Sequence, residues 1–411
     1  MSGDAIGGVS GEGLEGFRAE VRGWLEANCP PLMRTPSEGD EGDVWGGRRA
    51  VFAHPEQKLW LDRMAARGYT APTWPREYGG AGLSREEARV LAEELRRIGA
   101  RIALKSLGIW MLGPLLLQHG TDEQKRTHLP AIARGEIRWC QGYSEPGAGS
   151  DLASLTTSAR RDGEFYVVSG QKVWTSHADK ADWLFCLVRT DPATKSRAGI
   201  SFLLLDMASP GVSVRPIRLI SGASPFCETL LHEVHVPVTN RVGPEHGGWA
   251  IAKELLEHER AAMSSLRDAA VAEETPLEEL ARRYAGTVPD GAGGTRIADP
   301  GLRDRIAQAN LDSLANRLML RRTAEAAALG LPPGPEASLF KFYGTGLNQR
   351  RRDLRVLAAG YRGLGWEGAP FSTEELRATR DWLRSRANSI EGGTSEIQLN
   401  IIAKRVLGLP D

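Results

Sequence analysis

A polar loop, Ser144-Glu145-Pro146-Gly147-Ala148-Gly149-Ser150-Asp151, is the stretch of this chain whose residue types most clearly favour chemistry. Proline fixes one φ angle, and the two glycines permit a positive φ and a close approach of the backbone. Such a loop presents backbone N–H groups and hydroxyls to an anion or to the polar edge of a ring. Taken alone, the loop is more typical of a surface turn than of a binding site.

A second polar stretch, Trp174-Thr175-Ser176, follows shortly afterwards. Partial alternation of apolar residues between Glu164 and Ser176 predicts a strand, a turn at Ser169-Gly170 and a second strand. Two polar loops, 142–150 and 174–176, would then lie on one small β unit. One carries the hydroxyl of Ser144, and the other carries an indole and the hydroxyl of Ser176. Trp174 by itself is equally well explained by core packing.

These motifs resemble the acyl-CoA dehydrogenases, in which a loop of the type TEPGAGSD and a Trp-x-Thr/Ser loop hold the isoalloxazine ring of FAD. The resemblance keeps the order and spacing of the motifs over nearly the whole chain. It continues through Ser221–Glu228, Val234–Pro237, Gly392–Gln398 and Val406–Pro410. It implies an acyl-CoA substrate that loses an α proton and gives a β hydride to the flavin, which yields the trans-2-enoyl-CoA. Electrons would pass to an external acceptor such as electron-transfer flavoprotein.

The resemblance also implies which residues form the site. The residues implied to bind the cofactor are Gln141, Tyr143, Ser144, Trp174, Thr175, Ser176, Thr394 and Glu396. Those implied to line the substrate are Ser150, Arg260 and Gly392. Two motifs depart from the family, because Arg282-Arg283-Tyr284 stands where an Arg-x-x-Phe-Gly segment is usual and Val356–Gly360 replaces Gln-x-x-Gly-Gly. Cofactor contacts across a subunit interface are therefore left open.

A carboxylate base is the remaining requirement, and the chain offers two candidates. Many family members carry this glutamate where the chain has Gly392, whereas the isovaleryl-CoA dehydrogenase branch takes it from the helix that opens the C-terminal domain. Glu259, directly before Arg260, matches the second position, and Glu391 is the alternative. The apolar residues at helical spacing around Glu259 are Ala252, Leu255, Leu256, Met263 and Leu266. Burial on that face would raise the pKa of a carboxylate, although a structural ion pair fits the residues as well.

The elements that must position these residues fall into three regions. Helical spacing of apolar residues predicts helices at Leu14–Asn28, Glu56–Arg67, Ser84–Ile98, Leu104–His119 and Asp122–Arg134. Short runs rich in Val, Leu and Phe then predict a small antiparallel β domain, with strands at Phe165–Val168, Trp183–Val188, Ile200–Leu205, Val212–Pro216 and Thr229–His235.

Helical patterns return after Gly248. Long helices are predicted at Trp249–Tyr284, Pro300–Leu329, Pro335–Ala359, Thr373–Arg386 and Thr394–Leu407, with a Gly/Pro-rich break at 286–294. The fold class is therefore α+β, with an N-terminal helical domain at 1–135, a middle β domain at 136–241 and a C-terminal helical domain at 242–411. The acyl-CoA dehydrogenase fold has the same order.

Composition narrows the function classes. Lys+Arg and Asp+Glu both number 52, and this zero net charge argues against binding to nucleic acid or to a membrane surface. No signal peptide, no long apolar span and no metal-ligand spacing of His or Cys is recognisable. The four cysteines are scattered, which favours a reduced cytoplasmic protein. The run Arg350-Arg351-Arg352 is interpreted as a solvated helix face rather than a phosphate site.

Several functional alternatives remain at this level. The resemblance implies a homotetramer or homodimer, and an interface at Ile397–Leu409 is consistent with it. The glycine at position 392 leaves room near the reacting carbons, which suggests a branched, cyclic or bulky acyl group. A relative with oxidase or monooxygenase chemistry, or a FAD-binding subunit of a hetero-oligomeric dehydrogenase, is the alternative reading.

Overall fold

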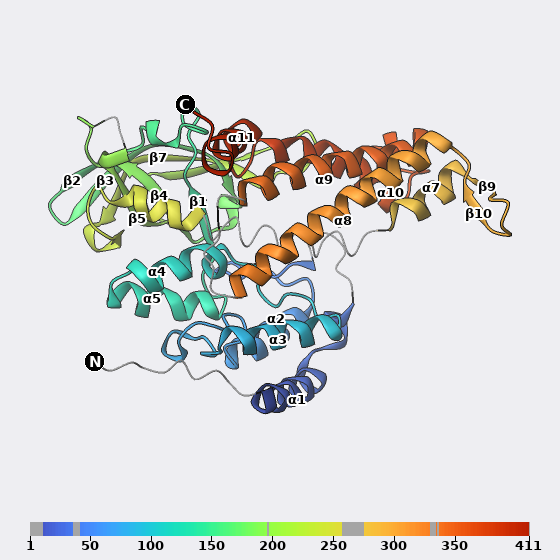
Figure 1. Cartoon of the computed structure of the whole chain (residues 1–411). Coiled ribbons are helices and arrows are strands. Elements are labelled where there is room, and N and C mark those ends of the chain that lie inside the picture. Colours follow the sequence, from blue (N-terminus) through green and yellow to red (C-terminus); the bar gives the residue numbers. More distant parts are fainter. Residues whose placement is uncertain are drawn as a thin grey trace. The chain divides into compact units, whose positions relative to one another are not determined.

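The computed structural model describes residues 11–35, 42–194, 197–256, 275–328, 334 and 337–410. The chain forms two compact units. The first unit comprises Met1–Ile217 and Pro225–Glu259, and the second comprises Arg218–Ser224 and Arg260–Asp411 (Figure 1). Helices precede and follow one central sheet along the chain, so the predicted α+β class is confirmed. The domain boundaries at 135 and 241 stay predictions.

Five α-helices open the described part of the first unit. They are α1 (Gly11–Asn28), α2 (Pro55–Ala66), α3 (Arg85–Arg97), α4 (Gly113–His119) and α5 (Asp122–Ala133). Capping boxes begin three of them, because the side chains of His54, Ser84 and Thr121 accept hydrogen bonds from the first turn. The prediction of one helix from Leu104 to His119 was wrong at its start. Pro114 cannot donate a backbone hydrogen bond, and a π-helical turn at Gly108–Leu112 precedes α4.

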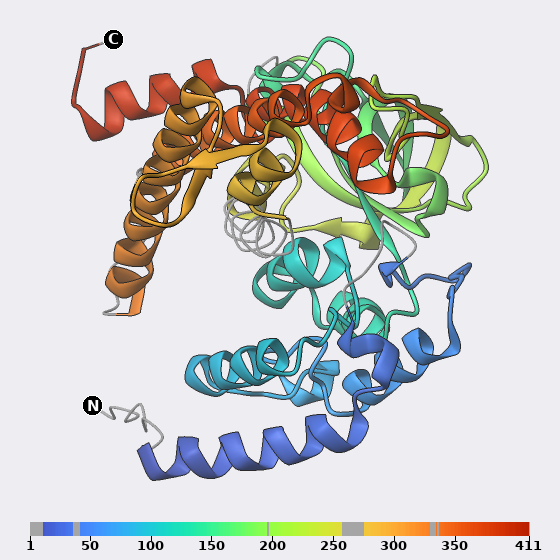
Figure 2. The same ribbon diagram turned by 90° about the vertical axis from the view of Figure 1, so that its right-hand side faces the viewer.

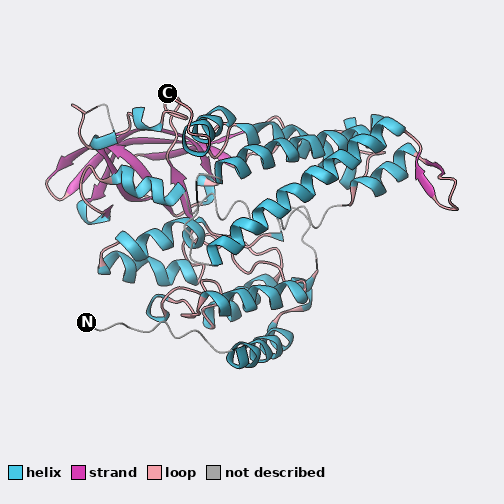
Figure 3. Cartoon of the chain, viewed as in Figure 1, coloured by secondary structure: helices cyan, strands magenta, loops and turns pink. Residues whose placement is uncertain are grey.

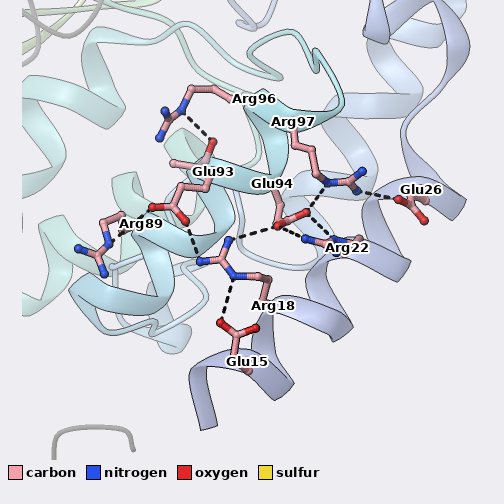
Figure 4. A network of polar contacts seen from close by, with 10 residues as sticks. Glu15, Arg18, Arg22, Glu26, Arg89, Glu93, Glu94, Arg96 and Arg97 are labelled. Carbon is pink, nitrogen blue, oxygen red and sulfur yellow. Dashed lines mark hydrogen bonds and ion pairs between the residues drawn. The ribbon is translucent and has the colours of Figure 1, made fainter. Parts of the chain in front are cut away.

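Helices α1 and α3 are joined by an ion-pair network centred on Glu94 (Figure 4). Helix α1 is the blue helix at the bottom of Figure 2. The Glu94 side chain is only 2% exposed and accepts hydrogen bonds from Arg18 at 3.2 Å, from Arg22 at 2.9 Å and from Arg97 at 2.6 Å. The bond from Arg22, followed by those from Arg97 and Arg18, outweighs burial and lowers the pKa of Glu94 from 4.5 to about 2. The pairing therefore stabilises the native state above about pH 4.5, and this contribution is lost as the pH falls toward 2.

Replacing Glu94 by glutamine is expected to lower the free energy of unfolding by about 1–3 kcal/mol, because three guanidinium groups lose their shared charge partner. Thermal melts of the two proteins at pH 7 measure this loss, and it should shrink toward pH 2–3. Asp62→Asn is the matched control, since Asp62 and Lys58 are both more than half exposed and their pair should contribute less than about 0.5 kcal/mol. Equal melting temperatures for Glu94→Gln and the wild type at pH 7 would contradict the expectation.

Eight strands of the described residues form one sheet, drawn in magenta in Figure 3. They are β1 (Trp139–Gly142), β2 (Ser158–Asp162), β3 (Phe165–Ser176), β4 (Trp183–Arg189), β5 (Ile200–Asp206), β6 (Val212–Ile217), β7 (Phe226–Pro237) and β8 (Arg241–Val242). Their order is β6-β7-β3-β2-β4-β5-β8, and β1 pairs with β4. The sheet is mostly antiparallel as predicted, but β1 runs parallel to β4, and the sequence reading missed both β1 and β2.

The predicted turn at Ser169-Gly170 was also wrong. Strand β3 is continuous from Phe165 to Ser176, with register shifts against β7 between Val168 and Gly170 and between Lys172 and Thr175. A Cβ atom on Gly170 would lie 2.5 Å from the Thr157 hydroxyl, so this glycine permits a close contact rather than a reversal of the chain. The two predicted polar stretches are therefore positioned by strands rather than by a hairpin turn.

The sheet separates two apolar clusters of the first unit. On one side, residues of α4 and α5 such as Leu115, Leu116 and Ile132 pack with Phe185 and Phe202. On the other side, Tyr166, Cys186 and Leu203 belong to a cluster made of strand residues. Fully buried strands of this kind give continuous apolar runs in sequence, as in β4 and β5. The loops at the strand ends are consequently held by a rigid support.

The second unit contains α7 (Leu277–Ala285), α8 (Pro300–Ala328), α9 (Ala337–Ala359), α10 (Thr373–Ser385) and α11 (Ser395–Ile401). The single helix predicted from Trp249 to Tyr284 was wrong, because residues 275 and 276 are not helical and α7 begins directly after Pro276. The break at 286–294 contains β9 (Thr287–Pro289), where only a loop was expected, and β9 pairs with β10 (Thr295–Ile297) just after the break to form a two-stranded hairpin. Among the described residues, no helix is both long and apolar enough to cross a membrane.

Candidate functional site

The loop that follows β1 is closed by two backbone hydrogen bonds of its own and is joined to β3 by a third. The Glu145 N–H donates to the Ala148 carbonyl at 3.0 Å, and the Ala148 N–H returns a bond to Glu145 at 3.1 Å, which closes a tight turn. The Val173 N–H donates to the Ser144 carbonyl at 2.9 Å. The structure therefore brings together the two polar stretches that the sequence singled out, with Ser144 one hydrogen bond away from the residue that precedes Trp174.

Trp174 has an unusual backbone and an exposed side chain. Its φ angle is +61°, a conformation that costs a non-glycine residue on the order of 1–2 kcal/mol. The indole is 54% exposed, and its main ring contact is an edge-on one with Phe226 at 6.2 Å. Core packing within the first unit, the alternative interpretation of Trp174, therefore does not explain the position of its side chain. Strain and an exposed large aromatic side chain together are typical of a ligand-binding position.

The other cofactor residues expected in the first unit differ in exposure. Ser144, Ser176 and Gln141 are half-buried. Thr175 is fully buried, and its hydroxyl has no hydrogen-bond partner among the described residues. The Tyr143 ring is buried and meets Phe185 and Phe202 edge-on. Of these five residues, Ser144, Ser176 and Gln141 thus have partly exposed polar side chains, whereas Thr175 and Tyr143 could reach a ligand with their backbone groups.

The loop leaves open space around its tip. A Cβ atom added to Gly147 or to Gly149 would meet no atom within 4 Å. Ser150, the residue expected on the substrate side, is exposed at this tip. An exposed indole beside half-buried hydroxyls and an open, glycine-containing loop fits a flat aromatic ring with a polar edge, and the isoalloxazine of FAD is such a group.

A buried ion pair beneath the loop was missed from the sequence. The Lys172 ammonium lies 2.8 Å from a carboxylate oxygen of Glu145, and the two side chains are 0% and 4% exposed. The sequence did contain a signal for a buried lysine. Alternate residues of the strand, Tyr166 and Val168, are buried, and Lys172 continues this alternation. Because the partner lies 27 residues away, the sequence could not identify it.

Protonation of this pair follows from its surroundings. Burial by itself would raise the pKa of Glu145, but the Lys172 charge and hydrogen bonds from Thr157 and Thr156 lower it to about 2. Burial lowers the pKa of Lys172 below its ordinary 10.5, while Glu145 acts in the opposite direction. Because donor and acceptor are in direct contact, we take the carboxylate as ionised and the ammonium as its counter-ion.

The second unit holds the C-terminal motif. Thr394 caps α11, accepting a hydrogen bond from the Ile397 N–H at 3.3 Å, and the Glu396 side chain is exposed. Gly392 has φ +64°, and a Cβ atom on it would meet no atom within 4 Å. Gly393 has φ +90°, and a Cβ there would lie 2.6 Å from the buried Gln398 amide. The turn therefore requires glycine at 393 for space and leaves open volume beside 392.

Glu391, the alternative base, is occupied by neighbours of its own unit. One carboxylate oxygen lies 2.7 Å from the Arg384 guanidinium, and the other accepts a hydrogen bond from the Asn388 amide. A base must be free to accept the substrate proton in hydrogen-bond reach. The pairing of Glu391 accordingly favours a structural role for this residue.

Glu259 and Arg260 lie outside the described residues, and so do Met263 and Leu266. The described residues 248–256 are helical and agree with the predicted apolar face, since Ala252 and Leu255 are buried. Glu254, which the spacing places off that face, is partly exposed and lies 2.6 Å from His119.

The arginines that the sequence analysis singled out are paired within the second unit. Arg283 bonds to Glu374 at 2.8 Å and to Glu279 at 3.1 Å. Arg350 lies 3.2 Å from Asp312 of α8, and the neighbouring arginines of α9 bond to Ser313 and Asp381. These contacts tie α7, α8, α9 and α10 together, so helix packing accounts for the arginine run.

Comparisons with known proteins identify the family of this chain. Models described as the N-terminal, middle and C-terminal domains of acyl-CoA dehydrogenase match residues 12–136, 140–234 and 246–407. The chain is 37% identical over 398 residues to "Acyl-CoA dehydrogenase IpdE1" of Mycobacterium tuberculosis, and the match covers 97% of this chain and 98% of that protein.

Two solved structures of similar fold cover nearly the whole chain. "Tcur3481-Tcur3483 steroid ACAD" has a TM-score of 0.74 and 29% identity, with 97% of both chains covered. The "ChsE4-ChsE5 complex from Mycobacterium tuberculosis" has a TM-score of 0.72 and 31% identity, with 99% of this chain and 100% of that chain covered.

Proposed function

The chain belongs to the acyl-CoA dehydrogenase family, a family of FAD-dependent oxidoreductases, and we propose that it introduces an α,β double bond into a bulky acyl-CoA thioester. The observation that carries the proposal is the exposed indole of Trp174, held at φ +61° beside Ser144 and Ser176. When bound, FAD supplies the acceptor for the two electrons of the reaction. All other tasks fall to the side chains of the protein.

Those tasks are divided between the two polar stretches and a glutamate. Trp174 covers one face of the ring, and Ser144 and Ser176 bond to its polar edge. Thr394 and Glu396 supply cofactor contacts from the C-terminal motif. Glu259 takes the α proton of the thioester, a role that Glu391 fills poorly because Arg384 and Asn388 already engage its two oxygens.

The substrate class is argued from Gly392. Many other family members have a glutamate at this position, and here an added Cβ would meet no atom within 4 Å. The space that a glutamate side chain would fill is thereby open to substrate. A structure named as a steroid ACAD is 29% identical over nearly the whole chain. The open space supports a bulky acyl group, and the name of this relative supports one that carries rings, such as a steroid thioester.

A second candidate concerns assembly. The names of two solved relatives each join two different proteins, Tcur3481 with Tcur3483 and ChsE4 with ChsE5. This favours a hetero-oligomeric dehydrogenase in which the present chain is one subunit, over the homotetramer or homodimer that the family resemblance suggests. An external carrier such as electron-transfer flavoprotein would then reoxidise the flavin of the assembly.

Anaerobic titration of the purified protein tests these proposals. We expect a yellow protein whose visible absorbance is bleached by a ring-bearing acyl-CoA at lower concentration than by short, medium or long straight-chain acyl-CoAs. Bleaching by straight-chain thioesters alone would contradict the substrate class. A protein that stays colourless after incubation with FAD would contradict the cofactor site as a property of this chain alone.

A further inference from the structure

The buried pair of Glu145 and Lys172 makes several hydrogen bonds. One oxygen of Glu145 accepts the Lys172 ammonium at 2.8 Å and the Thr157 N–H at 2.9 Å. The other accepts the N–H and the hydroxyl of Thr156 at 2.7 and 2.8 Å. The Lys172 ammonium also donates to the Tyr143 carbonyl at 3.2 Å. Two charges in the core are therefore surrounded by directional bonds instead of water.

The pair lies between the two polar stretches of the proposed FAD site. Glu145 follows Ser144 directly, and Lys172 precedes Trp174 by two residues. Between them runs the backbone bond from Val173 to the Ser144 carbonyl at 2.9 Å. The ion pair and this bond together join the two stretches that form the FAD site in the proposed function.

Stability alone does not account for such a pair. Removing two charges from water costs about as much free energy as their attraction returns, and a well-packed apolar pair of similar volume is often at least as stable. What a bonded ion pair adds over an apolar pair is a defined geometry, because each of its bonds has a preferred length and direction. A site that must hold a rigid ring between two stretches benefits from that definition.

We propose that Glu145 and Lys172 are positioning residues that fix the distance between the Ser144 loop and the Trp174 stretch, and thereby the affinity and orientation of bound FAD. The inference rests on the proposed FAD site. Neither side chain touches the cofactor in this account, since both are buried beneath the loop. The alternative is an ion pair that only contributes to folding stability.

Three variants separate these roles: Glu145→Gln, Lys172→Met and the double variant that carries both changes. Each single variant leaves one unpaired group in the core, so we expect a lower melting temperature of the apoprotein and FAD affinity about tenfold weaker or more. The double variant has no buried charge left unpaired, so its melting temperature should return toward that of the wild type. Its FAD affinity should stay weakened by about tenfold, and the visible circular dichroism of its bound flavin should differ from the wild type.

The readouts are the FAD dissociation constant from fluorescence titration, the visible circular dichroism and the apoprotein melting temperature. Glu94→Gln is the matched control, because it breaks a buried ion-pair network of the same unit away from both stretches and should leave the FAD constant and the dichroism unchanged. Wild-type FAD affinity and dichroism in the double variant would overturn the inference. Failure of the wild-type protein itself to bind FAD would contradict the proposed site, and this inference with it.

Discussion

Replacing Glu259 by glutamine is expected to lower the rate of substrate-dependent flavin bleaching by about 10²- to 10⁴-fold, the usual contribution of a general base. Glutamine keeps the size of the side chain but cannot accept the α proton of the thioester. The bound FAD and its visible spectrum should be unchanged, because the proposed ring contacts come from Ser144, Trp174 and Ser176. Anaerobic stopped-flow mixing with the best acyl-CoA of the panel measures the rate.

Glu391→Gln is the matched control for this experiment. Its carboxylate pairs with Arg384 at 2.7 Å and accepts a bond from Asn388, so the substitution should cost some stability of the second unit and little of the rate. Wild-type bleaching in Glu259→Gln, together with a loss of bleaching in Glu391→Gln, would move the base to the C-terminal turn. The two outcomes are separated by orders of magnitude in rate.

Replacing Trp174 by alanine is expected to weaken FAD binding by roughly 5- to 150-fold, which corresponds to about 1–3 kcal/mol of lost ring stacking. The melting temperature of the apoprotein should change little, because the indole is 54% exposed and contributes little to the core. A fully buried tryptophan would instead cost about 3–5 kcal/mol of stability when truncated. Titration of the apoprotein with FAD gives the FAD dissociation constant, and a thermal melt of the apoprotein gives its melting temperature.

Trp174→Phe is the control, since it keeps an aromatic face on the same backbone and should retain most of the FAD affinity. A large fall in apoprotein stability with unchanged FAD affinity in Trp174→Ala would assign the indole to packing. That result would also remove the observation on which the proposed function depends.

Sequence reasoning went furthest where the information is local. The glycines and hydroxyls of 144–150 are neighbours in sequence, and the indole at 174 lies 24 positions after Ser150, so the order and spacing of these two motifs were enough to predict one site. Ser84 and Thr121 predict helix starts because a capping side chain and its partner lie three residues apart. The family and the α+β order of elements follow from the same local patterns. The same comparison of local motifs showed that Gly392 stands where many family members have a glutamate.

Contacts between distant residues were decided only by the tertiary structure. The ion pair of Lys172 with Glu145 joins residues 27 positions apart, and the Glu94 network joins residues more than 70 apart. Gly170 was read as a turn because its role, a close approach to Thr157, depends on a neighbouring strand. The parallel pairing of β1 with β4 joins residues 44 positions apart, Trp139 with Trp183. Residue type and spacing therefore determined the chemistry available to this protein. Tertiary packing decided which charged groups are buried, paired or exposed. The reason is that desolvation and hydrogen-bond geometry depend on neighbours from the whole fold.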